Sequence, residues 1–208
     1  MIRIPKDYKP TVDEVKKYID CWNGPQNEVG KNKELALKKL FEVLCSENKD
    51  INDVLIKCST LNDFYSTNIF DVHSVAQRIW DLDIDERLRQ GDLTLVSDIA
   101  HVWVGKQGKS KTERCFYSFA TKYCSHHQPE KYAIYDNYVE KVLVDFNKKE
   151  RGDRFSCFTL KNLKDYKNFI RVIRDFQNHF GLTQFTLKEL DQYLWQLGKK
   201  YYGKYDKK

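Results

Sequence analysis

The chain has 208 residues, of which 41% are hydrophobic and 32% charged, and its formal net charge is +6 at pH 7. It contains no stretch of ~18 uncharged apolar residues that could span a bilayer, no secretory signal at the N-terminus and no CxxC pair among its six cysteines. These features argue against membrane insertion and a disulfide framework. They predict a cytoplasmic, intracellular monomer that folds as one compact unit.

The distribution of positive charge points to a possible partner. Five lysines lie between Leu197 and Lys208, and a second group precedes the central helix: Lys106, Lys109, Lys111 and Arg114. Aromatic residues follow this second group directly. Phosphates attract such cations and bases stack on such rings, so the pattern favours a nucleic-acid partner.

Capping residues and apolar spacing predict three helices at the start of the chain. The first opens on the capping box Thr11-Val-Asp-Glu14, and the second runs from Lys33 to Cys45. The third follows Asp50 and extends from Val54 to Leu61. These residues are predicted to be scaffold.

A polar elbow follows the third helix. It consists of three small polar residues, Ser66, Thr67 and Asn68, and its apolar neighbours are expected to be anchored in the core: Phe64, Tyr65, Ile69 and Phe70. Two interpretations stay open. The elbow either caps the helix that follows it or presents its side chains to a ligand.

A glycine-containing hairpin is predicted between a helix capped by Asp92 and a helix from Ser110 to His127. Its exposed amides and lysines form a candidate phosphate seat at four residues: Gly105, Lys106, Gly108 and Lys109. A flexible basic loop is the alternative interpretation.

The central helix leads to one aspartate in an apolar, aromatic setting. Pro129 ends that helix, and the spacing of Tyr135, Val139 and Leu143 starts a new one, so Asp136 falls at an N-cap or first-turn position. A carboxylate at such a position usually serves as a cap, but the aromatic neighbours are expected to keep water away from it, which is the environment that a catalytic carboxylate needs.

The rest of the chain is predicted to be helical. Apolar residues at helical spacing indicate a long helix from Thr159 to Phe180 that Gly181 ends, and the capping box Thr186-Leu-Lys-Glu189 opens the last helix. No convincing strand pair is evident, so the predicted fold is all-α, with two lobes around a cleft. Residues 1–90 form the scaffold lobe and the elbow, 91–146 the hairpin segment, and 147–208 the C-terminal helices.

Metal and cofactor sites find little support. Cys124, His126 and His127 suggest zinc, but adjacent histidines on a helix diverge by about 100°, and no paired cysteines complete a tetrahedral set. His73 has no partner at metal spacing, and no phosphate-loop or nucleophile-elbow motif occurs. No cofactor is expected.

The order helix, basic hairpin, helix and aspartate resembles the helix-hairpin-helix superfamily of DNA glycosylases, particularly its 8-oxoguanine glycosylase-like branch. Asp136, within Tyr132-Ala-Ile-Tyr-Asp-Asn-Tyr-Val139, matches that family's invariant aspartate. Ser66-Thr-Asn-Ile69 is similar to the branch's Asn-rich turn, which fills the hole left by an extruded base. The turn with the helix after it, and the region of helix, hairpin, helix and aspartate, together cover roughly a third of the chain.

The chain departs from the family pattern in three respects. Its hairpin is longer, and it has no cysteines that match the family's iron–sulfur ligands. The family's nucleophilic lysine would fall at Tyr117 or Ser118, where this chain has none; the nearest are Lys111 and Lys122. Lys122 is expected to point along a different helix face, which favours water as the nucleophile.

The resemblance implies a glycosylase that flips a damaged or modified base out of double-stranded DNA and cleaves its N-glycosidic bond. Asp136 would stabilise the oxocarbenium charge, in a cleft facing the elbow, while Tyr132 and Tyr135 line the base pocket. Two alternatives remain: a helical DNA- or RNA-binding module without catalysis, and a helical protein-interaction component.

Overall fold

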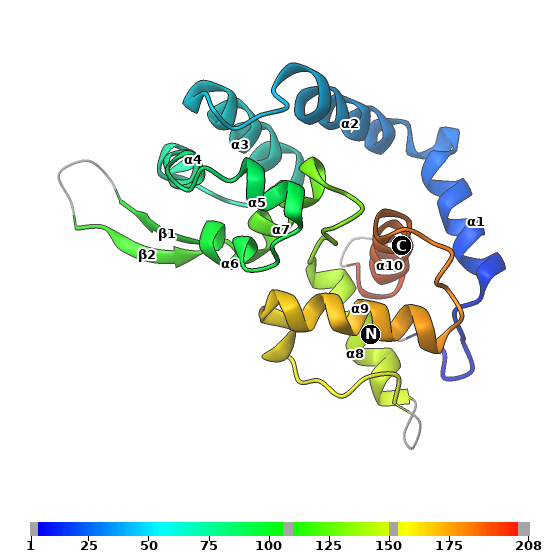
Figure 1. Cartoon of the computed structure of the whole chain (residues 1–208). Coiled ribbons are helices and arrows are strands. Elements are labelled where there is room, and N and C mark those ends of the chain that lie inside the picture. The colour runs from blue at the N-terminus through cyan, green and yellow to red at the C-terminus, as the bar shows by residue number, and fades with distance from the viewer. Residues whose placement is uncertain (1–3, 106–109, 150–153, 204–208) are drawn as a thin grey trace. The chain divides into compact units, whose positions relative to one another are not determined.

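The computed structural model describes residues 4–105, 110–149 and 154–203 (Figure 1). These residues fall into two compact units. Unit 1 combines Met1–Glu28 with Tyr135–Lys208, and unit 2 is Val29–Ile134. The described elements are mostly helices, which confirms a mainly helical class, but unit 2 also contains a two-stranded sheet. The prediction that no strand pair occurs was therefore wrong.

All secondary-structure elements among the described residues of unit 1 are helices. Its elements are α1 (Val12–Asn23), η1 (Pro25–Asn27), α8 (Asn137–Lys149), η3 (Asn162–Lys164), α9 (Tyr166–His179) and α10 (Leu187–Tyr202). Both predicted caps are present: the Thr11 hydroxyl accepts from the Glu14 amide, and Thr186 and Glu189 form a complete capping box. The long predicted helix is shorter than expected, because Asp165, and not Thr159, caps α9.

The packing of α8 against α10 depends on one glycine. A Cβ added at Gly198 would lie 2.6 Å from Tyr138 Cβ and 2.8 Å from the Tyr138 carbonyl oxygen. Atoms of one helix therefore occupy the space that a side chain would need on the other. The two helices approach this closely because position 198 carries no side chain.

We predict that Gly198→Ala destabilises the protein by about 1–3 kcal/mol, the usual cost of overpacking. Helix propensity alone predicts the opposite sign, a gain of about 1 kcal/mol. Urea unfolding of the variant measures the difference, with Lys199→Ala, at the neighbouring exposed position, as the control. A stabilised Gly198→Ala variant would contradict the close packing.

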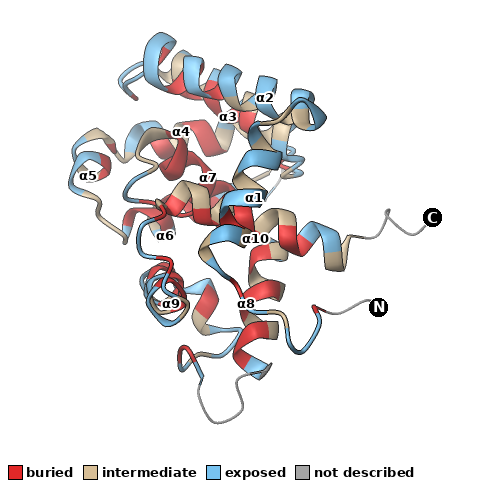
Figure 2. Cartoon of the chain, turned by 90° about the vertical axis from the view of Figure 1, so that its right-hand side faces the viewer, coloured by how far each residue is buried: buried red, intermediate tan, exposed pale blue. Residues whose placement is uncertain are grey.

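Unit 2 contains the sheet and the most deeply buried helix. Its elements are α2 (Glu28–Lys38), η2 (Lys39–Leu44), α3 (Ile51–Tyr65), α4 (Val72–Asp81), α5 (Asp85–Gln90), α6 (Leu95–Ala100), β1 (His101–Val104), β2 (Thr112–Cys115) and α7 (Tyr117–His127). Every residue of α7 from Phe119 to His126 is buried, as Figure 2 shows. The helix packs against α3 and α6, so it forms the centre of this unit.

The hairpin is built from strands, contrary to expectation. β1 and β2 pair antiparallel, with His101 opposite Cys115 and Val104 opposite Thr112 (Figure 1). The β-branched and aromatic residues of β1 favour an extended backbone. Because residues 112–115 pair with β1, α7 begins at Tyr117 and not at Ser110.

The second predicted helix also differs in detail. It starts earlier, at Glu28, and changes at Lys39 into the π-helix η2, in which the Cys45 amide donates to the Leu40 carbonyl. Such single-turn π segments are rare and concentrate near functional sites.

Among the described residues, no helix combines the length and apolar composition needed to cross a membrane.

Candidate functional site

The elbow is a fixed turn at the end of α3. Ser66 and Asn68 have positive φ angles of 50° and 57°, conformations that non-glycine residues adopt only where surrounding contacts hold them. The side chain of Asn62 supplies those contacts. Its Oδ1 accepts from the Thr67 hydroxyl at 2.8 Å and from the Ile69 amide at 2.9 Å, and its Nδ2 donates to the Ile69 carbonyl. The elbow is therefore held in shape by Asn62.

Residues of the elbow and of the hairpin line one groove in unit 2. It has a volume of about 720 Å³ and is lined by Asn68, Phe70, Asp71, Val104, Gly105, Thr112, Arg114 and Phe116. Phe70 is 100% exposed, so the expectation that it is anchored in the core was wrong. Ile69, which is 3% exposed, occupies the core position instead, and the Phe70 side chain that follows it lies in solvent. Tyr65, which was also expected to be anchored in the core, is 37% exposed.

Asp71 joins the two walls of this groove. Its carboxylate accepts from the Ser74 amide at 3.1 Å and the Ser74 hydroxyl at 2.7 Å, which caps α4. It also accepts from the Gly105 amide at 3.2 Å. Although burial opposes it, these hydrogen bonds hold the pKa of Asp71 below its usual value. The lining of the groove therefore includes an ionised carboxylate, which accepts hydrogen bonds.

The hairpin differs from the predicted phosphate seat. The Gly105 amide is bonded to Asp71 and is not presented to a ligand, and a Cβ at this position would lie 3.1 Å from Lys111 Cα. The lack of a side chain at Gly105 therefore allows the two strands to approach each other closely. The other predicted members, Lys106, Gly108 and Lys109, lie outside the described residues.

Four side chains meet around one buried lysine near the start of α7. We call them the cationic cluster: Lys122, Ser118, Tyr65 and His126. Lys122 is only 3% exposed, and its Nζ lies 2.6 Å from the Ser118 hydroxyl. The same Nζ lies 5.1 Å from the centre of the Tyr65 ring, whose hydroxyl pairs with His126 Nε2 at 2.9 Å. Tyr65 is the last residue before the elbow. The structure thus brings the elbow and the central helix together within one unit.

This geometry corrects the expected direction of Lys122. Residues four apart on a helix share a face, so the Lys122 side chain extends back along α7 and its amine reaches Ser118. Ser118 is one of the two positions where the family pattern would place a lysine. Lys111 does not join this cluster. It is exposed and directly precedes β2, so the four residues of that strand separate it from the segment that leads into α7.

Asp136 belongs to unit 1 and caps α8. Its Oδ1 accepts from the Tyr138 amide at 2.8 Å, its carbonyl accepts from the Glu140 amide, and the residue is half-buried. The predicted N-cap position is confirmed. The expectation that Asp136 faces the elbow concerns two different units and stays a prediction.

The two tyrosines proposed for a base pocket are packed inside the units. Tyr132 is 0% exposed, and its hydroxyl donates to the Asp92 carbonyl at 3.1 Å. Tyr135 is 4% exposed, and its hydroxyl bonds Glu140 and Lys164, which form an ion pair at 3.2 Å. Both rings contribute to cores, and neither lines the groove.

Sequence analysis missed a second buried lysine. Lys57 is 0% exposed and donates to the Cys45 and Glu47 carbonyls and to Asn48 Oδ1 at 2.7–3.0 Å. Its Nζ also lies 3.3 Å from His127 Nε2. The three acceptors follow the end of η2, so the lysine closes that π turn against α3 and α7. Only the position of Lys57 within an apolar helix face hinted at burial.

Burial lowers the pKa of both Lys57 and His127. It lowers the pKa of Lys57 to about 8, and burial together with the nearby charge of Lys57 holds the pKa of His127 well below its usual value. Neither histidine of this helix is arranged as a metal ligand. Within the described part of the chain, no group of three or more His, Cys, Asp or Glu side chains could hold a metal ion.

Comparison with known proteins places the chain in a family. A family model described as HI_0787_N, N-terminal domain, matches residues 14–131. The chain is also 50% identical over 155 residues to an uncharacterized protein of Haemophilus influenzae, an alignment that covers 74% of this chain and 70% of that protein. The chain belongs to the HI_0787_N family. No solved structure matches it.

The extent of the HI_0787_N match is informative. Residues 14–131 include the elbow, the hairpin and all of α7 with Lys122, and they end before Asp136. The groove and the cationic cluster therefore lie entirely within the matched domain. Asp136 and the other residues of α8 lie beyond it.

We predict that Lys57 makes a contribution to the stability of the protein that rises between about pH 8 and pH 10.5, while buried tyrosines and cysteines with raised pKa values contribute with the opposite sign. In this window the unfolded chain keeps a proton on Lys57 that the folded protein has lost, so raising the pH favours the folded state, by up to about 3 kcal/mol. Urea unfolding at several pH values measures the slope, which Lys57→Met should reduce. The control is Lys38→Met, at an exposed lysine, and equal slopes in all three proteins would contradict the prediction.

Proposed function

We propose that the protein is a DNA glycosylase that excises a damaged or modified base, with water as the nucleophile. The observation that supports this most directly is the groove of unit 2, where a fully exposed Phe70 lies beside Arg114 and the elbow residue Asn68. An aromatic side chain without protein contacts is costly to leave in water. Inserted into a base stack, it would be covered.

The groove suits a duplex from which one base has been extruded. Base flipping costs about a few kcal/mol, which a side chain filling the vacant space offsets. Phe70 supplies an apolar wedge and Asn68 a polar group for the base left unpaired. Arg114 supplies a cation for the phosphates, and its neighbour Phe116 adds a second ring at the groove wall.

The chemistry is assigned to Asp136 by the resemblance. In the proposed step, the bond between the sugar and the base breaks and its electron pair leaves with the base. The carboxylate of Asp136 stabilises the positive charge that develops on the sugar. A water oxygen then bonds the anomeric carbon, and the proton that it loses balances the one that the departing base takes up, which leaves an abasic site and a neutral free base.

Lys122 is the amine that would replace water in a glycosylase with lyase activity. In this structure its ammonium is almost fully covered and is bonded to Ser118. An amine must be unprotonated and must reach the sugar to form a Schiff base. The contacts of Lys122 therefore favour a role as a positioned charge, with water as the nucleophile.

A non-catalytic nucleic-acid-binding module is the second candidate. The observation that favours it is the cap itself, because the Asp136 carboxylate already has a structural task at the start of α8. Both candidates use the groove, and they differ in whether a base is released.

We predict that Asp136→Asn abolishes base release and leaves DNA affinity unchanged or improved. Asparagine caps a helix as well as aspartate does, so the fold should be retained. Mass spectrometry of free bases released from damaged and from naturally modified DNA measures the activity. Asp165→Asn, at the cap of α9, is the matched control and should retain it. Release of no base from any DNA by the unaltered protein would favour the non-catalytic module.

Borohydride trapping on a duplex whose base the protein releases tests the nucleophile. With water as the nucleophile, base release occurs without a covalent adduct. An adduct that is present in the unaltered protein and lost in Lys122→Ala or Lys111→Ala would overturn this assignment and make that lysine the nucleophile.

We predict that Phe70→Ala and Arg114→Ala weaken DNA binding in different ways. Phe70→Ala should reduce binding to a duplex with a mispaired base and leave the unfolding midpoint unchanged, since the ring has no core contacts. Arg114→Ala should weaken binding to all sequences alike and reduce the slope of affinity against salt by about 1. Leu44→Ala and Arg89→Ala, at exposed positions outside the groove, serve as controls. Equal effects of all four changes would argue against the groove.

A further inference from the structure

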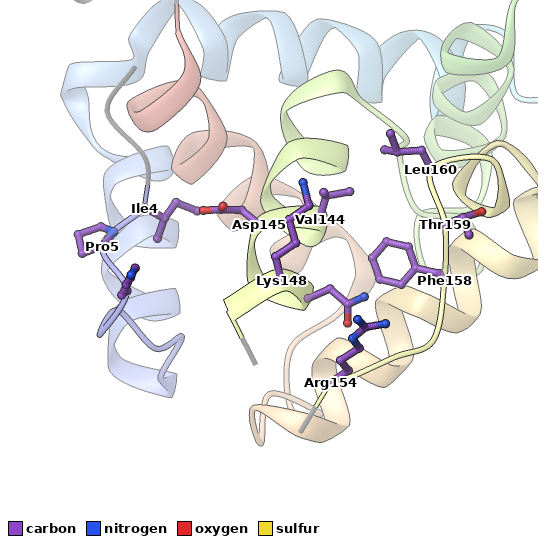
Figure 3. A pocket seen from close by; sticks show the side chains of 11 residues that line it. Ile4, Pro5, Val144, Asp145, Lys148, Arg154, Phe158, Thr159 and Leu160 are labelled. Carbon is purple, nitrogen blue, oxygen red and sulfur yellow. The ribbon is translucent and has the colours of Figure 1, made fainter. Parts of the chain in front are cut away.

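Unit 1 contains a pocket of its own, about 980 Å³ in volume, which the glycosylase proposal does not use. Three segments form it, as Figure 3 shows: the C-terminal part of α8, the N-terminal residues from Ile4 to Lys6, and the segment from Arg154 to Leu160. In that view Phe158 and Arg154 extend toward α8, and Ile4 and Pro5 lie on the other side of the helix. The volume is at the upper end of the range for small-molecule sites.

One wall of this pocket has an unsatisfied acceptor. Asn147 lines the pocket and is only 8% exposed, and its Oδ1 has no hydrogen-bond partner among the described residues. Buried side-chain oxygens almost always accept a hydrogen bond, and each exception calls for an explanation. A ligand that brings an N–H donor into the pocket would satisfy this oxygen and explain why it has no partner within the protein.

The charges around the acceptor indicate what else the ligand carries. Among the described residues that line the pocket, three have cationic side chains, Lys6, Lys148 and Arg154, and one has a carboxylate, Asp145. Arginine and lysine together are typical of phosphate recognition. The half-buried ring of Phe158 offers an aromatic face next to them. The pocket thus combines a cationic group, a flat apolar surface and a buried acceptor.

We propose that this pocket binds a nucleoside monophosphate. The phosphate lies against Lys148 and Arg154, the base stacks on Phe158, and an N–H on the edge of the base donates to Asn147 Oδ1. Every nucleobase has such a donor on its Watson–Crick edge, whereas inorganic phosphate has no flat apolar face to cover the ring. The ligand is either a free nucleotide or the phosphorylated end of a strand, since the two share this chemistry.

Isothermal titration calorimetry of the full chain with each deoxynucleoside 5′-monophosphate tests the site. We expect at least one of them to bind, and the matching nucleoside and inorganic phosphate each to bind at least tenfold more weakly. Asn147→Leu should weaken binding at least tenfold without lowering the unfolding midpoint, because it removes an unpaired buried acceptor. Lys148→Ala, at an exposed position, should weaken it similarly and provides a second variant if Asn147→Leu does not fold.

Two controls make the result specific. Lys188→Ala, elsewhere in unit 1, should retain nucleotide binding, and so should Asp136→Asn, whose loss of base release is a separate outcome. A single strand that binds more tightly with a 5′-phosphate than without one, in a manner that requires Lys148, identifies the strand end as the source. Tighter binding of the free nucleotide than of that strand identifies the free form. Absence of nucleotide binding, or binding that neither Asn147→Leu nor Lys148→Ala changes, would overturn the proposal.

Discussion

The Asp71 carboxylate accepts hydrogen bonds from the start of α4 and from the Gly105 amide, 34 residues further along the chain. Bonds to an ionised acceptor are stronger than neutral ones, so this contact fixes the hairpin against the residues that follow the elbow. The groove has two walls at a constant spacing for this reason. Asn62 shapes the elbow from the α3 side, and Asp71 connects the start of α4 to the hairpin.

Much of the secondary structure followed from short-range chemistry in the sequence. The caps at Thr11, Thr186 and Asp136 form where they were predicted, because a cap depends on residues only a few positions apart. The strands could not be predicted in the same way. Thr112-Glu-Arg-Cys115 is exposed along its whole length and has no alternating apolar pattern, so its pairing with β1 is visible only in three dimensions.

The candidate site was predicted less completely than the helices, since burial and direction depend on tertiary packing. Phe70 appeared to be a core residue by composition, yet Ile69 fills the core and leaves the ring outside. Lys57 has the composition of a surface residue, yet three acceptors hold it in the interior. Lys122 was expected on a different face because it lies about one helical turn past Ser118, but a residue four positions along a helix shares that face, and its side chain extends back to Ser118.

The division into units has a consequence for how the chain is made. Unit 2 is one continuous segment, but unit 1 is assembled from residues on either side of it, and α1 packs against α10. At a synthesis rate of ~5–20 residues per second, α10 leaves the ribosome roughly 10–35 seconds after α1. During that interval the inserted unit has all of its own contacts available, whereas the apolar face of α1 has no partner from α10. Completion of unit 1 thus waits for the synthesis of α10, which covers one face of α1.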